Sequence, residues 1–318
     1  MRNRILALLR KTDGYVSGEE MSRTLSISRA AVWKHIKRLR AEGYDIVSAK
    51  NNGYRLGAAP DEITPDAVKA LLRTRFMARN IEYKKSTGST NEDAKRSCDS
   101  PDGTLFISDI QTAGKGRRGR AWSSPPGSGI WMSLLLKPDI APERVSQLTL
   151  IAGIAVCRAI GVGARIKWPN DIVIGTKKVS GILTELSAEP DMVNYAVCGI
   201  GINVNTAEFP EELRDRATSV YLETGLRSSR AELTARVMNE LEPLYERFIS
   251  GGFAPLADEY RDMCATIGRE VNVTGRGTEL SGTAVDVDAD GALIIDTGGS
   301  TAAVTSGEVS VRGIYGYT

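Results

Sequence analysis

Hydrophobic residues near the start of the chain recur with the spacing of three short amphipathic helices. The first helix is marked by Ile5, Leu8 and Leu9. The second begins at a capping box of Ser17 and Glu20, whose side chains each satisfy a free backbone N–H, and runs to about Leu25. The third begins at the N-cap Ser28, and its inward stripe consists of Val32, Ile36 and Leu39. A tight turn at 26–28 separates the last two, so the pattern predicts a helix-turn-helix.

A β-hairpin is predicted directly after these helices. Its strands span residues 45–48 and 53–56, and Asn52-Gly53 between them is typical of a type I′ turn. Three helices followed by a hairpin predict a winged helix-turn-helix, a fold whose third helix enters the major groove of DNA.

The charge distribution agrees with this prediction. The first 57 residues hold 12 Lys and Arg against 5 Asp and Glu, a net charge of +7, and the remaining residues hold 29 against 34, a net charge of −5. A run of charge is most often a solvated helix face, but here it coincides with the predicted helix, turn and wing, which favours DNA binding. The candidate DNA-binding residues are Ser28, Arg29, Trp33, Lys34, Lys37 and Arg38.

Strand-like and helical segments are interspersed through the middle of the chain. Strands are predicted at 81–85, 104–109, 130–137, 164–174, 179–186 and 194–203. Helices are predicted at 146–160, 230–249 and 64–77, the last with Thr64 as its N-cap and Pro65 at its first position. This order is typical of an α+β domain, in which a mixed sheet packs against helices.

Short strands separated by turns dominate the last fifty residues. They are predicted at 270–274, 279–288, 292–296, 300–305 and 309–313, with turns at Asp290-Gly291 and Gly298-Gly299. Five short strands in this length predict a small β-barrel resembling an SH3 fold. The sequence thus predicts three domains: a winged helix-turn-helix at residues 1–60, the α+β domain at 61–266 and the small barrel at 267–318.

Composition argues against several classes of protein. No apolar run reaches the length of a bilayer span, and the first residues lack the apolar core of a signal peptide. The four cysteines are scattered without paired spacing, which argues against a disulfide framework or a zinc knuckle. The single histidine, His35, leaves little material for a His-based metal site or catalytic triad. We therefore expect a cytoplasmic protein with reduced thiols and no membrane partner.

A basic, glycine-rich loop is the most informative segment of the predicted α+β domain. It has the sequence Gly114-Lys115-Gly116-Arg117-Arg118-Gly119-Arg120 and is followed by Trp122. Its glycines allow the backbone to close on a ligand, and its four cations can offset the charge of a carboxylate or a triphosphate. The loop does not match the P-loop pattern, and Gly199-Ile200-Gly201 does not extend to a dinucleotide fingerprint. By itself the loop is weak evidence for such a site, because nucleic-acid contact or a flexible surface turn is the more common explanation of a basic, glycine-rich segment.

Three further segments carry polar or charged groups at predicted strand ends. Ser89-Thr90-Asn91 follows the first strand of the domain and offers short polar groups suited to a small neutral head group. The segment 167–171 places Trp168 beside an amide and a carboxylate, and 177–183 places Lys178 at the start of an apolar strand. Taken singly, Trp168 is more often a packing residue, Asp171 a turn-former and Lys178 a solvated strand end.

Together and in this order, these segments resemble the bifunctional biotin–protein ligase/biotin operon repressor family. The matching pieces are 89–91, 111–113 leading into 114–120 and Trp122, 167–171, 178–183 and 199–203, and the resemblance also covers the winged helix and the C-terminal segment. It implies a class II synthetase-like catalytic domain that uses ATP and Mg²⁺ to convert biotin to biotinyl-5′-AMP. It also implies transfer of biotin to a lysine of the biotin carboxyl carrier protein of acetyl-CoA carboxylase. The adenylate would act as corepressor, promoting a homodimer that binds operator DNA.

The resemblance also implies roles for individual residues. The biotin contacts would be Ser89, Thr90, Asn91, Gln111, Lys115, Gly116, Arg117 and Lys178. The nucleotide contacts would be Arg118, Arg120, Trp122, Asn170 and Asn203, the two asparagines being candidates for Mg²⁺ as well. Lys178, Arg117 and Asp171 would be catalytic, with Lys178 polarising the acyl-phosphate and Asp171 orienting the incoming lysine. We expect no metal site built by protein side chains; the Mg²⁺ would arrive bound to ATP.

One departure from the family pattern concerns the loop. Lys115 stands where the bifunctional enzymes often have arginine, which keeps the charge but loses the planar fork of a guanidinium. Arg312 is within reach of a nucleotide only if the last domain covers the site, and a surface position is the simpler interpretation.

Three alternatives to this interpretation stay open at this point. The first is a lipoate–protein ligase, which shares the catalytic fold but not the winged helix or the 167–171 motif. The second is a regulator that senses the adenylate without transferring biotin, which Lys178 and Arg117 disfavour. The third is a ligase whose winged helix no longer regulates transcription.

Overall fold

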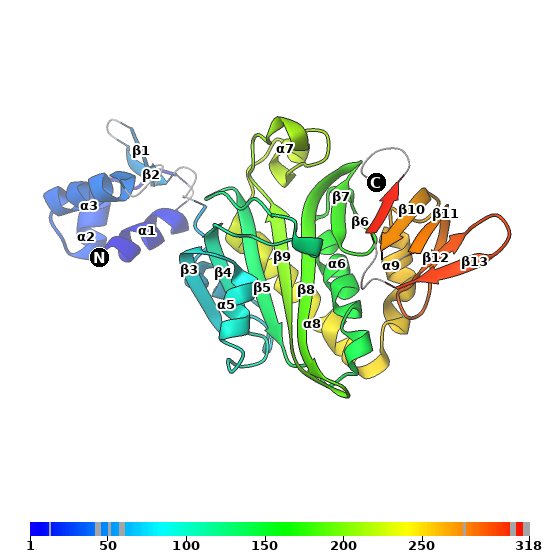
Figure 1. The fold of residues 1–318 in the computed structure, drawn as a ribbon. Coiled ribbons are helices and arrows are strands. Elements are labelled where there is room, and N and C mark those ends of the chain that lie inside the picture. The colour runs from blue at the N-terminus through cyan, green and yellow to red at the C-terminus, as the bar shows by residue number, and fades with distance from the viewer. Residues whose placement is uncertain are drawn as a thin grey trace. The chain divides into compact units, whose positions relative to one another are not determined.

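The computed structural model describes residues 1–12, 14–41, 46–49, 52–56, 61–275, 278–305 and 310–313. The chain divides into two compact units, Met1–Glu62 and Ile63–Thr318 (Figure 1). Each has its own hydrophobic core.

The first unit contains the predicted helices and hairpin. Its elements are α1 (Arg2–Lys11), α2 (Gly18–Leu25), α3 (Arg29–Ala41), β1 (Ile46–Ala49) and β2 (Gly53–Leu56). Ser17 caps α2 by accepting from the N–H of Glu20 at 3.0 Å, and Ser28 accepts from the N–H of Ala31 at 3.2 Å. The predicted inward stripe of α3 is buried among residues of α1 and α2. The prediction of a helix-turn-helix followed by a hairpin is confirmed.

The predicted two-residue turn of the hairpin is wrong. Gly53 already belongs to β2 and pairs with Ala49, so Asn52-Gly53 is not the central pair of a type I′ turn. A different contact requires the glycine: Tyr54 pairs with Val16, and a Cβ on Gly53 would lie 2.2 Å from the carbonyl oxygen of Val16. The segment before α2 therefore occupies the space that a side chain would need. Residues 45, 50 and 51 lie outside the described residues.

A mixed seven-stranded sheet forms the centre of the second unit, within the continuous range 61–275. Its strands are β3 (Ile81–Thr87), β4 (Leu105–Gln111), β5 (Gly129–Leu136), β6 (Ala164–Lys167), β7 (Asp171–Ile174), β8 (Lys177–Glu189) and β9 (Met192–Asn203). The order is β3-β4-β5-β9-β8-β7-β6, with β3 parallel to β4 and all other neighbours antiparallel. The two longest strands, β8 and β9, pair with each other in the middle of the sheet.

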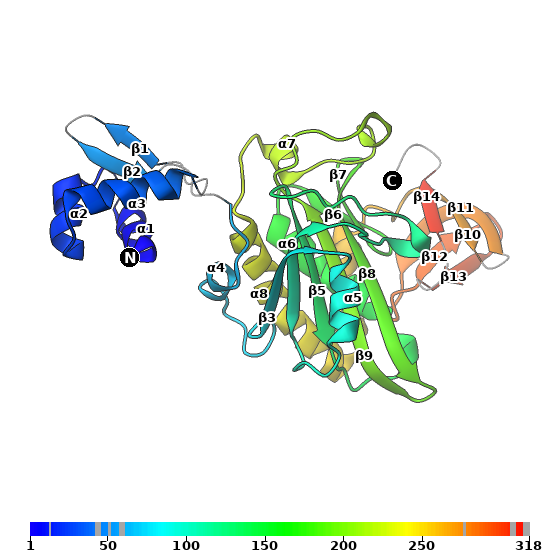
Figure 2. The same ribbon diagram turned by 60° about the vertical axis from the view of Figure 1, so that its left-hand side comes forward.

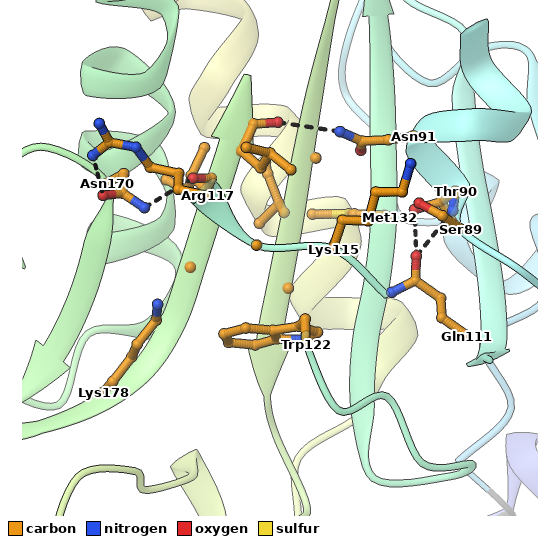
Figure 3. Close-up of a pocket in the computed structure, with 17 residues that line it drawn as sticks. Ser89, Thr90, Asn91, Gln111, Lys115, Arg117, Trp122, Met132, Asn170 and Lys178 are labelled. Carbon is orange, nitrogen blue, oxygen red and sulfur yellow. Dashed lines mark hydrogen bonds between the residues drawn. The ribbon is translucent and has the colours of Figure 1, made fainter. Parts of the chain in front are cut away.

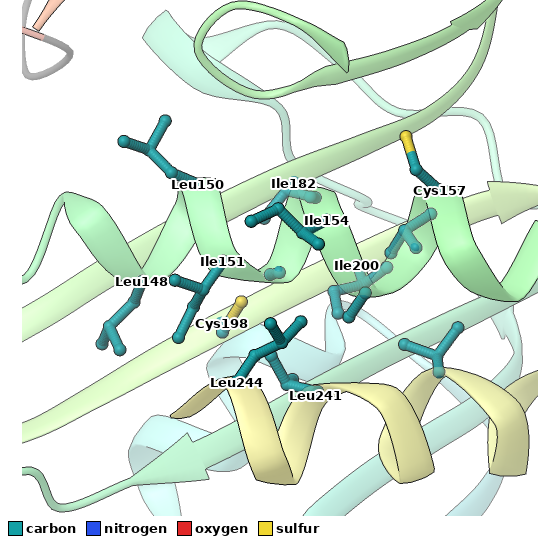
Figure 4. Packing of buried hydrophobic residues seen from close by; sticks show 14 of the residues in the cluster. Leu148, Leu150, Ile151, Ile154, Cys157, Ile182, Cys198, Ile200, Leu241 and Leu244 are labelled. Atoms are coloured by element: carbon teal, nitrogen blue, oxygen red, sulfur yellow. The ribbon is translucent and has the colours of Figure 1, made fainter. Parts of the chain in front are cut away.

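Helices cover both faces of this sheet. They are α4 (Pro65–Lys69), α5 (Thr90–Arg96), α6 (Gln147–Ile160), α7 (Val220–Thr224), α8 (Arg230–Gly251) and α9 (Ala257–Met263). Figures 1 and 2 show α6 and α8 together on one side and α5 on the other. Leu241 and Leu244 of α8 and Ile154 of α6 pack towards Ile182 and Ile200 of the sheet (Figure 4). A smaller apolar cluster lies beneath α5 and contains Ala94, Phe106, Leu135 and Val197. The predicted α+β architecture is confirmed.

Two predicted elements have the wrong extent. The run 164–174 is a hairpin, because the chain reverses at Trp168–Asn170, where the Trp168–Pro169 peptide bond is cis, and Lys167 pairs with Asp171. The helix predicted at 64–77 ends at Lys69. Beyond it, the buried carboxylate of Glu242 accepts from the N–H groups of Arg75, Phe76 and Met77 at 2.7–3.0 Å, and these groups are therefore not available to a helix. The short helices α5, α7 and α9 were not predicted.

The C-terminal part of the second unit is a small antiparallel sheet. Its described strands are β10 (Glu270–Gly275), β11 (Thr278–Val287), β12 (Leu293–Asp296), β13 (Thr301–Val304) and β14 (Ser310–Gly313), in the order β13-β12-β11-β10-β14. The indole N–H of the buried Trp168 donates to the carbonyl of Gly291 at 3.0 Å, which joins the β6–β7 turn to this sheet. The packing interpretation of Trp168 is therefore confirmed. Closure into an SH3-like barrel and the boundaries 1–60, 61–266 and 267–318 stay predictions.

Two expectations from composition can be compared with the described residues. Cys98, Cys157, Cys198 and Cys264 are all free thiols. None of the helices in the described ranges combines the length and apolarity needed to cross a membrane.

The contact made by Glu242 gives a first testable prediction. Burial alone raises the pKa of this carboxyl, but the backbone N–H groups of Phe76, Met77 and Arg75 lower it by more, so the pKa lies below its ordinary value. Glu242→Gln replaces an acceptor with an amide that offers donors to these N–H groups. We expect it to lower the free energy of unfolding at pH 7 by about 1–3 kcal/mol in urea titration.

The pH dependence and a neighbouring residue control this experiment. Because the folded-state pKa is lowered, the contribution of Glu242 is fully present above the ordinary value of 4.5 and is lost as the pH falls through the folded value. The matched control is Glu246→Gln. Glu246 belongs to the same helix but pairs with the side chain of Arg75, which is 77% exposed, and a solvent-exposed ion pair contributes little to stability. We expect this variant to cost at most about 1 kcal/mol. Equal losses for the two variants would contradict the role of Glu242.

Candidate functional site

A pocket of about 470 Å³, partly open to solvent, lies over the central strands β5, β9 and β8. Ten of the residues predicted from sequence line it: Ser89, Thr90, Asn91, Gln111, Lys115, Gly116, Arg117, Trp122, Asn170 and Lys178. Figure 3 shows hydroxyl and amide side chains on one side and Lys178, Arg117 and Asn170 on the other. The pocket thus has a cationic end at Lys178 and Arg117 and an end lined by hydroxyl and amide groups, called the neutral end because the charge of Lys115 is paired with Glu92.

The neutral end is built on the start of α5 and the end of β4. Gln111 accepts through Oε1 from the N–H of Thr90 at 2.9 Å and from its hydroxyl at 3.1 Å. The Gln111 amide then donates to Ser124 at 2.9 Å. The hydroxyl of Ser133 of β5 lies 2.7 Å from Thr90 Oγ1 and 2.5 Å from Asn91 Oδ1, and its single proton is available to one of them at a time. These contacts orient Thr90, Asn91 and Gln111 before any ligand arrives.

The floor of the pocket depends on glycines in β8 and β9. Asn91 lies directly on Gly199, where a Cβ would be 2.2 Å from the Asn91 Oδ1. Gly181 and Gly201 pair across the two strands, and the Trp122 indole lies on both, 2.7 Å from a Cβ at Gly201 and 3.1 Å from one at Gly181. Only glycine at these positions lets a side chain lie flat on the sheet.

Trp122 separates the two ends of the pocket. Its ring is 5.1 Å from the Lys178 ammonium and 6.3 Å from the Trp131 ring, which it meets edge-on. The indole N–H is buried without a hydrogen-bond partner in the structure. A flat aromatic face with an unsatisfied donor suits a planar ligand that carries acceptors.

The cationic end is formed by the β6–β7 turn, the start of β8 and the basic loop. The Lys178 ammonium pairs with Asp171 at 2.5 Å, and the Asn170 amide also donates to Asp171 at 3.2 Å. Arg117 donates to the Asn170 carbonyl oxygen at 3.0 Å. Burial lowers the pKa of the Arg117 guanidinium, the Asp171 charge raises it, and Arg118 and Arg120 lower it, so the net shift is downward. A bound anion would favour the charged form of this guanidinium.

The backbone of Lys178 is held by a segment far along the chain. Its N–H donates to the carbonyl of Arg216 at 2.8 Å, and its carbonyl accepts from the N–H of Thr218 at 2.9 Å. The amide of Asn203, at the end of β9, donates to the Thr218 carbonyl at 3.1 Å. The segment before α7 therefore fixes the position at which Lys178 enters the pocket.

Four predicted site residues do not line this pocket. Asp171 is not a lining residue, although it pairs with Lys178 and accepts from the Asn170 amide, and Asn203 is directed to Thr218. Arg118, which has a left-handed backbone at φ 58°, donates to the carbonyl of Thr274 in β10 at 3.3 Å. Arg120 is exposed, and its backbone closes the loop by accepting from the N–H of Gly116 at 2.7 Å. Their assignments to nucleotide or acceptor lysine stay predictions, and nothing is described of the Arg312 side chain.

Several lining residues were not predicted. They are Met132, Gly181, Ile182, Leu183, Gly199, Ile200 and Gly201. The alternation of Gly199 and Gly201 in an otherwise apolar strand was the available signal, because a strand glycine indicates a close approach by another group.

The predicted DNA-binding residues lie on the outer surface of α3. Ser28, Arg29, Trp33, Lys34, Lys37 and Arg38 are all exposed. The Trp33 side chain is 56% exposed, and its ring lies 5.3 Å from the Lys37 ammonium. An exposed tryptophan among cations is the feature of α3 that packing does not explain.

Neither end of the pocket offers a protein-built metal centre. Across the described ranges, no cluster of three or more His, Cys, Asp or Glu side chains is placed to hold a metal ion.

Three family models match this chain. The biotin/lipoate A/B protein ligase family matches residues 81–203, an HTH domain matches residues 2–55, and the biotin protein ligase C-terminal domain matches residues 266–312. The bifunctional ligase/repressor BirA of Bacillus spizizenii is 39% identical over 291 residues, which is 89% of this chain and 90% of that protein. BirA of Escherichia coli is 30% identical over 318 residues, 97% of this chain and 96% of that protein.

A solved structure shares the fold of the larger unit. The biotin protein ligase from Aquifex aeolicus in complex with biotin and ATP has a TM-score of 0.66 and 33% identity. The match covers 74% of this chain and 99% of that one.

The glycine floor gives a second prediction. Gly201→Ala places a methyl group 2.7 Å from the Trp122 indole, so we expect the ring to leave the sheet and tryptophan emission to shift to the red. The shift should vanish when Trp122→Phe is added. Gly299→Ala is the control, because no atom lies within 4 Å of its Cβ. An unchanged emission spectrum in Gly201→Ala would contradict the stacked position.

Proposed function

The chain belongs to the bifunctional biotin–protein ligase/repressor family, and from this premise we propose how its pocket activates biotin and transfers it to a carrier protein. The protein is an ATP-dependent biotin–protein ligase with an N-terminal DNA-binding domain that represses transcription. The identity of each contact, the acceptor, the metal and the oligomeric state belong to the proposal.

The observation that carries the proposal is the polarity of the pocket. Biotin has a neutral, hydrogen-bonding ring system at one end and a carboxylate at the other. The fixed hydroxyl and amide groups of Ser89, Thr90, Asn91 and Gln111 suit the ring system, and Lys178 and Arg117 suit the carboxylate. The apolar strand surface between them suits the connecting chain.

In the first step, a carboxylate oxygen of biotin attacks the α-phosphorus of ATP. The bond from that phosphorus to the bridging oxygen breaks, and pyrophosphate leaves with its electron pair. Lys178 and Arg117 stabilise the negative charge that gathers at this centre. Trp122, with its flat ring and free indole N–H, is positioned for the adenine, and Asn170, Arg118, Arg120 and Asn203 are assigned to the nucleotide. Mg²⁺ is assigned to the phosphates of ATP, because the described residues offer no acidic cluster.

In the second step, the amine of an acceptor lysine attacks the carbonyl carbon of biotinyl-5′-AMP. An amide C–N bond forms, AMP leaves, and the amine loses a proton. The Asp171 carboxylate is assigned to orient this amine, since it lies 2.5 Å from Lys178 at the same end of the pocket. The acceptor is a biotin carboxyl carrier protein, and the reaction takes place in the cytoplasm, where the carrier and the DNA are both available.

The repressor activity belongs to the first unit. We assign DNA contact to the exposed face of α3, with Trp33 and Lys34 towards the groove and Arg29, Lys37 and Arg38 towards phosphates. The adenylate acts as corepressor by promoting a homodimer, whose two copies of α3 bind two half-sites of a biotin operator.

A direct assay separates biotin from lipoate as substrate. Purified protein is incubated with ATP, Mg²⁺, a carrier domain and either acid, and the mass of the carrier is measured. We expect only biotin to be attached. Lys178→Met should lower the rate about 10²–10³-fold, as removal of one charge-stabilising group does in other enzymes.

The control for this variant is Lys177→Met. Lys177 is the preceding residue, but its ammonium donates to the carbonyl of Arg214 at 3.0 Å, away from the pocket. Its variant should keep a rate close to the original. Attachment of lipoate alone, or a normal rate in Lys178→Met, would contradict the proposal.

A second experiment tests the division of labour between the two units. Arg38→Ala should weaken binding to biotin operator DNA and lower the salt dependence by about one phosphate contact, without changing the ligation rate. Arg236→Ala, an exposed arginine of α8, is the control and should leave both properties intact. Loss of ligation in Arg38→Ala would show that the assignment is wrong.

A further inference from the structure

The basic loop at 114–120 is a closed hairpin whose side chains attach it to three different elements. Its backbone is joined by Gly116 to Arg120 at 2.7 Å and by Trp122 to Gly114 at 2.8 Å. Arg117 attaches it to the β6–β7 turn, and Arg118 attaches it to β10. The third attachment is to α5, where the Lys115 ammonium lies 2.7 Å from Glu92 Oε1.

The contact with α5 differs from the other two because it does not have to break when ligand binds. In the proposed function Arg117 and Arg118 contact the ligand, so their contacts with Asn170 and Thr274 have to compete with substrate. Glu92 does not line the pocket. Lys115 lies on the same side of the pocket as Asn91 and Thr90 (Figure 3). We therefore assign the Lys115 ammonium to Glu92 rather than to biotin, the contact that the resemblance implied, and the pair can persist while the pocket is filled.

Glu92 is also part of a continuous row of alternating charges. Its Oε1 accepts from Lys95 at 3.1 Å as well, and Lys95 reaches Glu185 of β8 at 2.7 Å. The other oxygen of Glu185 accepts from the amide of Asn91 at 2.7 Å. The loop is thus connected through two carboxylates and a lysine to the amide on the pocket floor.

The groups in this row stabilise one another as ions. The hydrogen bonds from Lys115 and Lys95 lower the pKa of Glu92. Burial lowers the pKa of Lys95, but Glu185 and Glu92 raise it by more, so its pKa is raised overall. The side chains of Lys115, Glu92, Lys95 and Glu185 are 28–49% exposed, so the row lies partly shielded from solvent.

We propose that Glu92 is a positioning residue that holds the 114–120 loop closed over the pocket through Lys115, so that bound biotin and its adenylate are retained between the two steps. This inference rests on the proposed function for the identity of the ligand, but the loop contact itself does not. Glu92→Gln releases Lys115 and leaves the Lys95–Glu185–Asn91 part of the row in place. The variant thus separates loop closure from the shape of the floor.

The first test measures loop closure without ligand. Trypsin cleaves after lysine and arginine, and the loop offers Lys115, Arg117, Arg118 and Arg120. In the full-length, ligand-free protein, Glu92→Gln should be cut within 114–120 about threefold faster than the original, as expected for loss of one partly exposed ion pair. Fragments are assigned by mass spectrometry.

A variant that removes a second ion pair of α5, the one between Asp93 and Lys84 of β3, controls for general destabilisation. Lys84→Met breaks the Lys84–Asp93 pair of 2.8 Å, whose lysine is 50% exposed against 49% for Lys115, but it does not touch the loop. It should leave cleavage of the loop unchanged. Lys115→Met should speed cleavage at the arginines as much as Glu92→Gln does, and the double variant should be no faster than either single one.

The second test measures retention of ligand. Biotin is displaced from each protein by an excess of unlabelled biotin, and we expect Glu92→Gln to release it about threefold faster while Lys84→Met releases it at the original rate. Equal loop cleavage in Glu92→Gln, Lys84→Met and the original protein would overturn the positioning role. So would additive effects in the double variant, or unchanged biotin release. Absence of biotin binding by the original protein would instead overturn the proposed function, and faster loop cleavage would still be observed if Glu92 holds the loop.

Discussion

The close approach of side chains to two adjacent strands is the constraint on which the pocket depends. Gly199 and Gly201 of β9 and Gly181 of β8 lack the Cβ atoms that would fill the space above the sheet. Asn91 occupies the place above one of them, and Trp122 lies across the other two. On the opposite face Ile182 and Ile200 of the same strands are packed against α6 and α8, which supports the floor from below. A floor supported in this way, with oriented polar groups, reduces the ordering that a ligand has to impose.

This floor keeps opposite kinds of chemistry at opposite ends of one pocket. At the neutral end Thr90, Asn91 and Gln111 are already hydrogen-bonded, whereas at the cationic end Lys178 is paired with the Asp171 carboxylate. In the proposed function the substrate carboxylate replaces this partner of Lys178, which leaves Asp171 beside the reacting centre to accept from the incoming amine. This exchange would connect substrate binding to transfer of biotin.

Local sequence patterns predicted the features that local interactions determine. The caps at Ser17 and Ser28, the stripe of α3 and most strands of the sheet follow from periodicity and short-range hydrogen bonds. The absence of a helix at residues 75–77 does not, because the Glu242 carboxylate that accepts from their N–H groups comes 165 or more residues later. The need for glycine at position 53 was likewise not predictable from local sequence, because it is the backbone of Val16 that leaves no room for a Cβ there.

The site was also predicted only in part. The sequence identified the motifs at residues 89–91, 114–120 and 178–183 and their order along the chain. It did not identify the residues that contact them, because the Lys115–Glu92 and Asn203–Thr218 pairs join segments that no sequence pattern connects. Trp168 illustrates the opposite case, a motif tryptophan whose contact is structural.

The central claim is that biotin binds over β8 and β9 in one direction, with its ring system at Thr90 and Asn91 and its carboxylate at Lys178, and a crystal structure of the protein soaked with biotin tests it most directly. The account predicts ring-system contacts to Thr90 and Asn91 and a carboxylate within ion-pair distance of Lys178. A reversed ligand, or one bound away from β8 and β9, would contradict it.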